Sequence, residues 1–181
     1  MTPVRPACSA HWPTPGCPPV LAAIRDPAAA AAAHAAGTGR AIDIALGGHP
    51  GIPGAEPFEG IFVVEHLSDG RCRFEGPMMH GTEIDSGPSA CLRINDVRVG
   101  VTSRKVQLID RSQLRMLGIR PERERIIVVK SSVHFRADFE PNAEAVLVAG
   151  APGPILANPA DLPWRHLRPG MRTSPLGPTA P

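Results

Sequence analysis

The chain has 181 residues, a length typical of a single domain with its own hydrophobic core. Its formal net charge is only +2, and it contains two tryptophans, five phenylalanines and no tyrosine. This composition argues against nucleic-acid binding, which depends on a basic surface or on exposed aromatic rings. No apolar run approaches the ~20 residues that span a bilayer, so we expect no membrane partner. The four cysteines form no CxxC pair, and we expect reduced thiols in a cytoplasmic protein.

The two ends of the chain differ in composition from its middle. Residues 1–20 and 168–181 are rich in proline and have no periodic apolar pattern. These features predict a flexible N-terminal segment and a disordered C-terminal tail. Residues 21–167 have the periodic patterns of one folded domain.

A strong helix signal opens the folded part. Asp26 is followed by Pro27, which combines a capping carboxylate with a proline at the first helical position. An alanine-rich run follows, and Gly37 is a natural stop. Because the predicted helix is almost entirely alanine, it must pack closely against another element to be stable.

Strand patterns dominate the next part of the chain. The predicted strands are residues 41–46, 60–67, 71–75, 90–94 and 97–102. Asp69 and Gly70 form a favoured hairpin turn between the second and the third, and Asn95 and Asp96 connect the last two. Several antiparallel hairpins with a few short helices predict a single α+β domain, in which Cys91 is a small core residue.

Two further helical segments flank a strand of distinctive composition. Residues 111–117 predict a short helix that ends at Gly118, and residues 137–146 predict a helical turn broken at Pro141. Between them, residues 125–131 predict a strand. Its four consecutive β-branched residues are typical of a strand that is covered on both faces.

Polar and cationic side chains follow this strand directly. They are Lys130, Ser131, His134 and Arg136. Ligands bind beyond the carboxyl ends of strands in open α/β sheets, so these four residues are candidates for ligand contacts. The alternative is that the cations are solvated and that Ser132 caps a following helix.

Several short motifs occur in a fixed order with short spacers. They are SGPSACLR at 86–93, VTSR at 101–104, LGI at 117–119 and KSSVHFRADF at 130–139. In this order they resemble the C-terminal domain of the MlrC (microcystinase C) family of metallopeptidases, over residues 24–169. Two departures are His49, where the family usually has lysine, and residues 1–20, which match none of its pattern.

The resemblance implies a longer enzyme that hydrolyses amides or peptides with zinc, held by histidines and acidic residues of a large N-terminal domain. We expect that domain to lie outside these 181 residues, and therefore no catalytic residue, metal ligand or cofactor in this chain. Its partner would be the N-terminal metal-binding domain or chain, and Lys130, Ser131, His134 and Arg136 would bind the peptide or amide substrate. A homodimer that buries the partner-facing surface is a further expectation.

Two other functions are consistent with the same residues. A self-sufficient metallohydrolase would use His80, Glu83, Asp85 and His134 as metal ligands, although their spacing fits no zinc signature. A degenerate structural module would bind no ligand and would expose an apolar face where a partner once packed. A serine hydrolase is disfavoured, because Ser131 lacks the flanking glycines of a nucleophile elbow.

Overall fold

The computed structural model describes residues 19–48, 56–131, 133–150, 158–174 and 176–177. The predictions for residues 1–18, for His49 and for Ser132 lie outside these residues. Two compact units divide the chain: residues up to 47 with 57–147, and residues 48–56 with 148–181. Each unit is described by itself, and the boundary expected at residue 167 stays a prediction.

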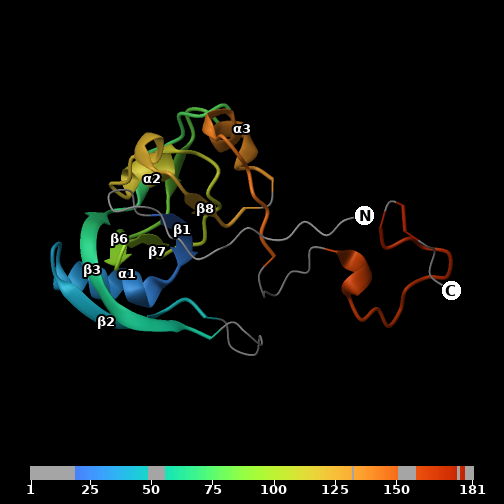
Figure 1. Cartoon of the computed structure of the whole chain (residues 1–181), viewed down its shortest axis with the longest axis horizontal. Helices are drawn as coiled ribbons and strands as arrows, with labels where there is room; N and C mark the ends of the chain where they lie inside the picture. Colours follow the sequence, from blue (N-terminus) through green and yellow to red (C-terminus); the bar gives the residue numbers. More distant parts are fainter. Residues whose placement is uncertain (1–18, 49–55, 132, 151–157, 175, 178–181) are drawn as a thin grey trace. The chain divides into compact units, whose positions relative to one another are not determined.

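A six-stranded sheet forms the centre of the first unit, in the order β2-β3-β6-β7-β1-β8 (Figure 1). Its strands are β1 (Val20–Arg25), β2 (Ala41–Leu46), β3 (Phe58–Ser68), β6 (Ser89–Ile94), β7 (Val97–Thr102) and β8 (Ile127–Val129). β1 pairs in parallel with β7 on one side and with β8 on the other, whereas the remaining neighbours are antiparallel. The predicted α+β class is confirmed, and β1 with its parallel pairing is a feature that the sequence analysis did not predict.

The predicted hairpin after β3 is wrong in its pairing. β4 (Arg71–Arg73) follows the turn, but it pairs with β5 (Glu83–Asp85) in a separate two-stranded sheet, while β3 pairs with β6. Gly70 has a φ of +83°, and a Cβ atom there would lie 1.8 Å from the carbonyl oxygen of Gly87. The backbone at Gly70 therefore packs directly against the backbone at Gly87, and β4 leaves the turn alongside β5 instead of folding back along β3. The second predicted hairpin, β6 with β7, is confirmed, with Asn95 in the turn at a φ of 50°.

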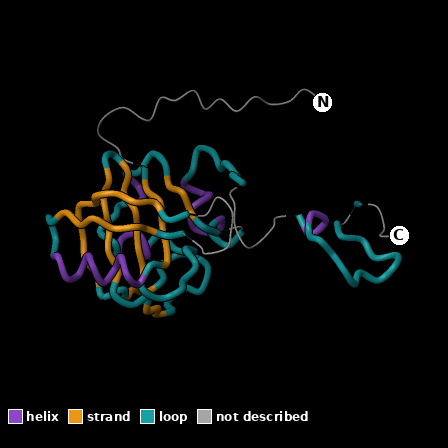
Figure 2. Tube along the Cα trace, turned by 90° about the horizontal axis from the view of Figure 1, so that it is seen from below, coloured by secondary structure: helices purple, strands orange, loops and turns teal. Residues whose placement is uncertain are grey.

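Helix α1 (Pro27–Ala36) lies along one face of the sheet (Figure 2). As predicted, Asp26 caps it: Oδ1 accepts a hydrogen bond from the Ala29 amide at 2.9 Å, and Gly37 ends it. Oδ2 of the same carboxylate accepts from the Gly47 amide at 2.9 Å and so fastens the end of β2. The buried alanines of α1 pack on Phe62 and Val64 of β3, and their small size lets the helix approach the sheet closely.

The opposite face of the sheet carries a second apolar cluster. Two short helices contribute to it, α2 (Ser112–Met116) and α3 (Arg136–Phe139), and α3 leads into the 3-10 turn η2 (Glu140–Asn142) that contains Pro141. The cluster consists of Val20, Ala22, Cys91, Leu108, Leu114, Leu117, Ile119, Phe135 and Phe139. Cys91 is buried in this cluster, which confirms the predicted core position, and burial raises the pKa of its thiol to about 12.

The expectation of a strand buried on both faces at residues 125–131 is wrong. β8 spans only Ile127–Val129 and forms the end of the sheet. Ile127 and Val129 pack against the second cluster, whereas Ile126 and Val128 are 41% and 48% exposed. The reason is that no described helix covers the other face of the sheet at this strand.

The second unit is small in its described part. It contains the 3-10 turn η3 (Pro159–Asp161), which Asn158 caps through its side chain. The Trp164 indole N–H donates to the Pro159 carbonyl at 2.7 Å and so closes this turn. Among the described helices of the whole chain, none is long and apolar enough to cross a membrane.

Candidate functional site

Three parallel strands end at the same edge of the sheet. β1, β7 and β8 run in one direction, so the residues after them lie at this carboxyl edge. The Lys130 amide donates to the Ala22 carbonyl at 3.4 Å, which carries the β8 pairing one residue past the strand. The candidate residues Lys130 and Ser131 therefore follow the end of β8 at this carboxyl edge, where sheet geometry predicts a ligand site.

Gln107, in the loop after β7, connects two of the candidate residues. Its Nε2 donates to the Ser131 Oγ at 3.0 Å, and its Oε1 lies 3.1 Å from the His134 Nδ1. With the amide in this orientation, Nδ1 of His134 is the donor and Nε2 is left facing away from Gln107. The Ser131 hydroxyl accepts from Gln107 and keeps its own hydrogen for a ligand.

The site is open to solvent. Lys130 and His134 are exposed and Ser131 is half-buried. Among the described residues, Lys130 makes no salt bridge. Its ammonium group is therefore available to pair with an anionic group of a ligand.

Arg136 has different partners. Its Nη1 donates to the Glu140 Oε1 at 2.7 Å, and its guanidinium lies 5.4 Å from the centre of the Phe135 ring. The structure therefore brings Ser131 and His134 together through Gln107, places Lys130 next to them in the chain, and engages Arg136 within α3. To contact a ligand, Arg136 would have to exchange Glu140 for it.

Two buried carboxylates fix the segment that holds Gln107. Asp110 accepts hydrogen bonds from the amides of Gly76 at 2.7 Å and Ser112 at 2.8 Å. Asp138 accepts from the Arg111 amide at 2.6 Å and from its Nε at 3.1 Å. These bonds tie the loop after β7 to α3, which directly follows His134. We call these residues the Asp110–Asp138 network.

Gly76 is the tightest point of this network. A Cβ atom there would lie 2.8 Å from the Asp138 Cγ and 2.9 Å from the Asp110 Oδ2, so a side chain would push the two acids aside. Burial raises the pKa of the Asp110 carboxyl, but hydrogen bonds from Ser112 and from the backbone of Gly76 outweigh this effect. The pKa consequently lies below its usual value, and the carboxylate is stabilised in its charged form.

The alternative metal-ligand set does not assemble. The described residues contain no group of three or more histidine, cysteine, aspartate or glutamate side chains that could hold a metal ion. His80 Nδ1 lies 3.0 Å from the Glu75 carbonyl, and Asp85 pairs with Arg104 at 2.6 Å. The backbone hydrogen bond from Gly87, followed by the contacts with Arg104, lowers the pKa of Asp85. His80 and Asp85 therefore already have partners within the protein.

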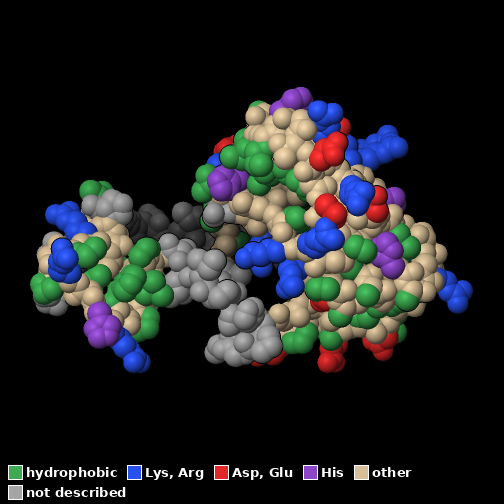
Figure 3. All heavy atoms as spheres, turned by 180° about the vertical axis from the view of Figure 1, so that it is seen from behind, with side chains coloured by type: hydrophobic (Ala, Val, Ile, Leu, Met, Phe, Trp, Pro, Cys, Tyr) green, Lys and Arg blue, Asp and Glu red, His purple; other side chains and the backbone are tan. Residues whose placement is uncertain are grey.

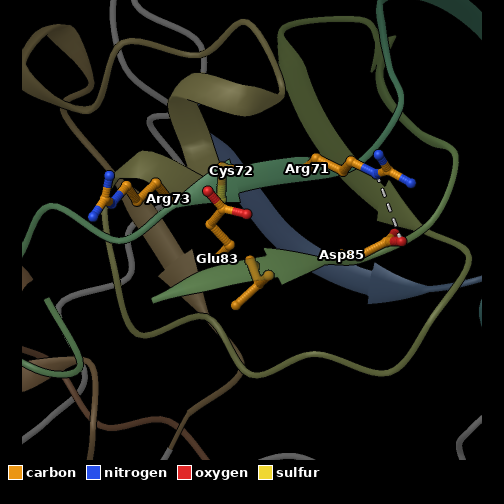
Figure 4. A pocket seen from close by; sticks show the side chains of 6 residues that line it. Arg71, Cys72, Arg73, Glu83 and Asp85 are labelled. Carbon is orange, nitrogen blue, oxygen red and sulfur yellow. Dashed lines mark ion pairs between the residues drawn. The ribbon is translucent and has the colours of Figure 1, made fainter. Parts of the chain in front are cut away.

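A pocket of about 500 Å³ lies on the small sheet of β4 and β5 (Figure 4). Arg71, Cys72, Arg73, Glu83, Ile84 and Asp85 line it. Arg71 pairs with Asp85 at 3.8 Å across the two strands, and the Arg73 Nε donates to the Gly81 carbonyl at 3.0 Å. Burial raises the pKa of the Cys72 thiol, which favours its neutral form. Arg71, Arg73 and Asp85 of the pocket thus make contacts that hold this small sheet together. Gln107, Ser131 and His134 do not line the pocket.

Gln107 is the site residue that sequence reasoning missed. It lies in a loop with no recognisable motif, five residues after Thr102, the last residue of β7. Only the parallel pairing of β7 and β8 with β1 places this loop beside Ser131. Gln107 could have been found from the sequence only if β1 had been predicted as the strand that pairs with both β7 and β8.

These features define an α+β domain with a polar carboxyl edge and no metal centre among its described residues. The chain belongs to the family described as MlrC C-terminus, which matches residues 9–166. A crystal structure of a protein from Mesorhizobium sp. BNC1, assigned to the metallopeptidases, is similar at a TM-score of 0.63 and 27% sequence identity. The similarity covers 70% of this chain but only 25% of that chain, so this domain spans a quarter of its relative. A search of curated protein sequences finds no match.

Proposed function

We propose that this domain forms the substrate side of an MlrC-type zinc metallopeptidase. In this proposal it binds a peptide or amide substrate at the carboxyl edge of β1, β7 and β8, and the N-terminal part of such an enzyme holds the zinc. The family membership and the quarter-length match to a protein assigned to the metallopeptidases support this division of labour. The observation that carries the proposal is the Gln107 contact with both Ser131 and His134.

Each edge residue has a specific task in substrate binding. Lys130, which is not engaged in a salt bridge with any described acid, pairs with a substrate carboxylate. The Ser131 hydroxyl donates to a substrate carbonyl. His134 accepts a peptide N–H at Nε2, because Gln107 holds its Nδ1 as the donor. The described residues contain no group of three or more side chains that could hold a metal ion, so the proposal assigns the zinc to the N-terminal part.

The zinc enters the reaction only through the N-terminal part. A zinc ion bound there would supply Lewis-acid activation of water for amide hydrolysis. The task of this domain is to hold that carbonyl still. Binding energy from a well-oriented substrate lowers the barrier by reducing the entropy lost in the transition state.

The experiment is a complementation assay with separately expressed parts. The 181-residue chain is mixed with the part of the Mesorhizobium protein that lies outside the matched quarter, and peptide hydrolysis is measured. Activity that requires both parts supports the proposal. Lys130→Ala should raise KM by about tenfold, the loss expected for one charge-assisted hydrogen bond of ~1.5 kcal/mol. His134→Ala should raise it by a smaller factor, about fivefold, because its hydrogen bond joins two neutral groups and contributes ~1 kcal/mol.

The matched control is Arg40→Ala, which removes an exposed cation at the start of β2, far along the sheet from β8. It should leave KM unchanged. Equal effects of Arg40→Ala and Lys130→Ala would mean that general charge, rather than a defined site, controls the reaction. In that case the assignment of the edge residues would be wrong.

A further inference from the structure

β8 has the sequence of a strand that is covered on both faces, but the described chain covers only one. Residues 126–129 are β-branched without interruption, a pattern typical of strands inside parallel sheets. Ile127 and Val129 pack against the second cluster, while Ile126 and Val128 are largely exposed. The sequence of β8 suits burial on both faces, but the described residues bury only one. We therefore expect another segment to pack on the second face.

The register shows which face is bare. Val128 lies opposite Leu21 of β1, and Leu21 packs against the cluster beneath α1. The exposed side of β8 is therefore the α1 face of the sheet. Helix α1 makes its main contacts with β2, β3, β6 and β7, which precede β1 and β8 in the sheet order (Figure 1).

The outer backbone edge of β8 is also open. The Ile126 carbonyl accepts from Val20 and the Lys130 amide donates to Ala22, so the alternate residues 126, 128 and 130 bond to β1. Ile127 and Val129 therefore direct their amides and carbonyls away from the sheet, where no described strand follows. The opposite edge strand, β2, has an exposed Asp43 in its middle, which is a common protection against strand pairing. β8 has no such charge between Ile126 and Val129.

We propose that β8 is the docking edge for the N-terminal part of an MlrC-type metallopeptidase. An extended segment of that part adds as a strand along β8, bonds to Ile127 and Val129, and covers Ile126 and Val128 with apolar side chains. This inference rests on the proposed function, because it takes the same N-terminal part as the partner. The next residues along β8 are Lys130 and Ser131, so docking here brings the partner directly beside the candidate site.

A second copy of this chain fits the surface less well. A stable dimer buries about 800 Å² per partner. Pairing of two copies along β8 would cover mainly Val128 and the preceding Ile126, far less than that area. A partner that makes up the other three quarters of a metallopeptidase chain has further surface to contribute, and covalent linkage in such a chain raises the effective concentration of the two parts.

The test follows the exchange of individual amides by NMR in the full 181-residue chain. Spectra are recorded with and without the part of the Mesorhizobium protein outside the matched quarter. The amides of Ile127 and Val129 should become at least tenfold more protected on mixing. Protection elsewhere with none at these two amides would overturn the proposal, and so would an absence of binding.

Substitutions separate the docking edge from other surfaces. Val128→Lys should weaken binding by at least tenfold, because a lysine there would have to bury its charge against the added strand. Val128→Thr, which keeps the shape and the strand propensity, should weaken it by a smaller factor and guards against misfolding. The matched control is Ile61→Lys on β3, at a residue that is 65% exposed and not part of β8. Equal binding by Val128→Lys and Ile61→Lys would contradict the proposal.

The outcomes distinguish this inference from the proposed function. Complementation of activity that survives Val128→Lys would overturn the docking edge and leave the proposed function in place. Protection at Ile127 and Val129 without any hydrolysis would support the docking edge and contradict the proposed function. A chain that dimerises alone, with the same two amides protected and the partner unbound, would overturn the inference in favour of a second copy.

Discussion

At the scale of single residues, Gln107 determines which atoms of Ser131 and His134 remain available for the proposed substrate. Its Oε1 accepts from His134 Nδ1, and this bond favours one tautomer of the imidazole. In Gln107→Ala the preference should weaken, since Nδ1 loses its acceptor. The imidazole ¹⁵N chemical shifts report the tautomer directly and should move toward a mixture of the two forms.

Ser131→Ala is the control for this measurement. It removes the other hydrogen bond of Gln107 but leaves the contact with His134. The ¹⁵N shifts of His134 should then stay as in the unmodified chain. If Ser131→Ala changes them as much as Gln107→Ala does, Gln107 is not the group that sets the tautomer.

Asp110 makes stability depend on pH in a defined direction. Its pKa in the fold lies below its ordinary value of about 3.9, so the unfolded chain binds more protons in this range. The stabilisation from this carboxylate is therefore complete above about pH 4 and is lost as the pH falls through the lowered pKa. Urea unfolding between pH 7 and pH 2.5 measures this loss.

Asp110→Asn tests the same carboxylate. The variant should be less stable than the unmodified chain at pH 7, and the difference should narrow as the solution is acidified. The reason is that protonation at low pH removes the negative charge of Asp110 from the unmodified chain, and Asp110→Asn already lacks this charge. A difference that stays constant down to pH 2.5 would show that the charge of Asp110 does not stabilise the network.

At the scale of elements, a single carboxylate joins α1 to β2. Asp26 accepts one hydrogen bond from Ala29 and another from Gly47. Asp26→Ala should lower the free energy of unfolding by about 1–2 kcal/mol, the usual cost of a lost N-cap with part of a second hydrogen bond. Asp26→Asn keeps one acceptor oxygen and should cost less. Urea denaturation of the three chains provides the comparison, and equal stability of Asp26→Ala would contradict this role.

The elements that the sequence predicts are those with local signals. Asp26, Pro27 and Gly37 fix α1 within a few residues, and the short connection at Asn95 fixes the β6–β7 hairpin. β1 was missed because its parallel pairing with β7 and β8 depends on residues far away in the sequence. The β4 pairing was wrong for a similar reason, since the contact of Gly70 with Gly87 cannot be read from either residue alone.

For the candidate site as well, the sequence indicates only the residues that follow one another in the chain, Lys130 to Arg136. The change from β-branched to polar residues occurs after Val129, where β8 ends, although the predicted strand continued to residue 131. Gln107 and the Asp110–Asp138 network could not be found, because they come from other loops that only the folded sheet brings near. The exposed face of β8 differs from its sequence pattern, and this difference is the basis of the docking proposal.

At the scale of the whole molecule, a net charge of +2 gives no strong long-range field that could steer a partner. Basic and acidic side chains are interspersed on the face shown in Figure 3, in keeping with a net charge of only +2. Specific recognition must therefore come from local arrangements such as the β8 edge and the residues around Gln107. In the proposed division of labour, this domain binds a substrate and a second part performs the hydrolysis.

The central claim is that this chain binds without cleaving. The most direct test is the zinc content of the purified 181-residue chain, measured together with its peptidase activity. We predict less than stoichiometric zinc and no turnover by the chain alone. Stoichiometric zinc with turnover would contradict the account and would direct attention back to His80, Glu83, Asp85 and His134.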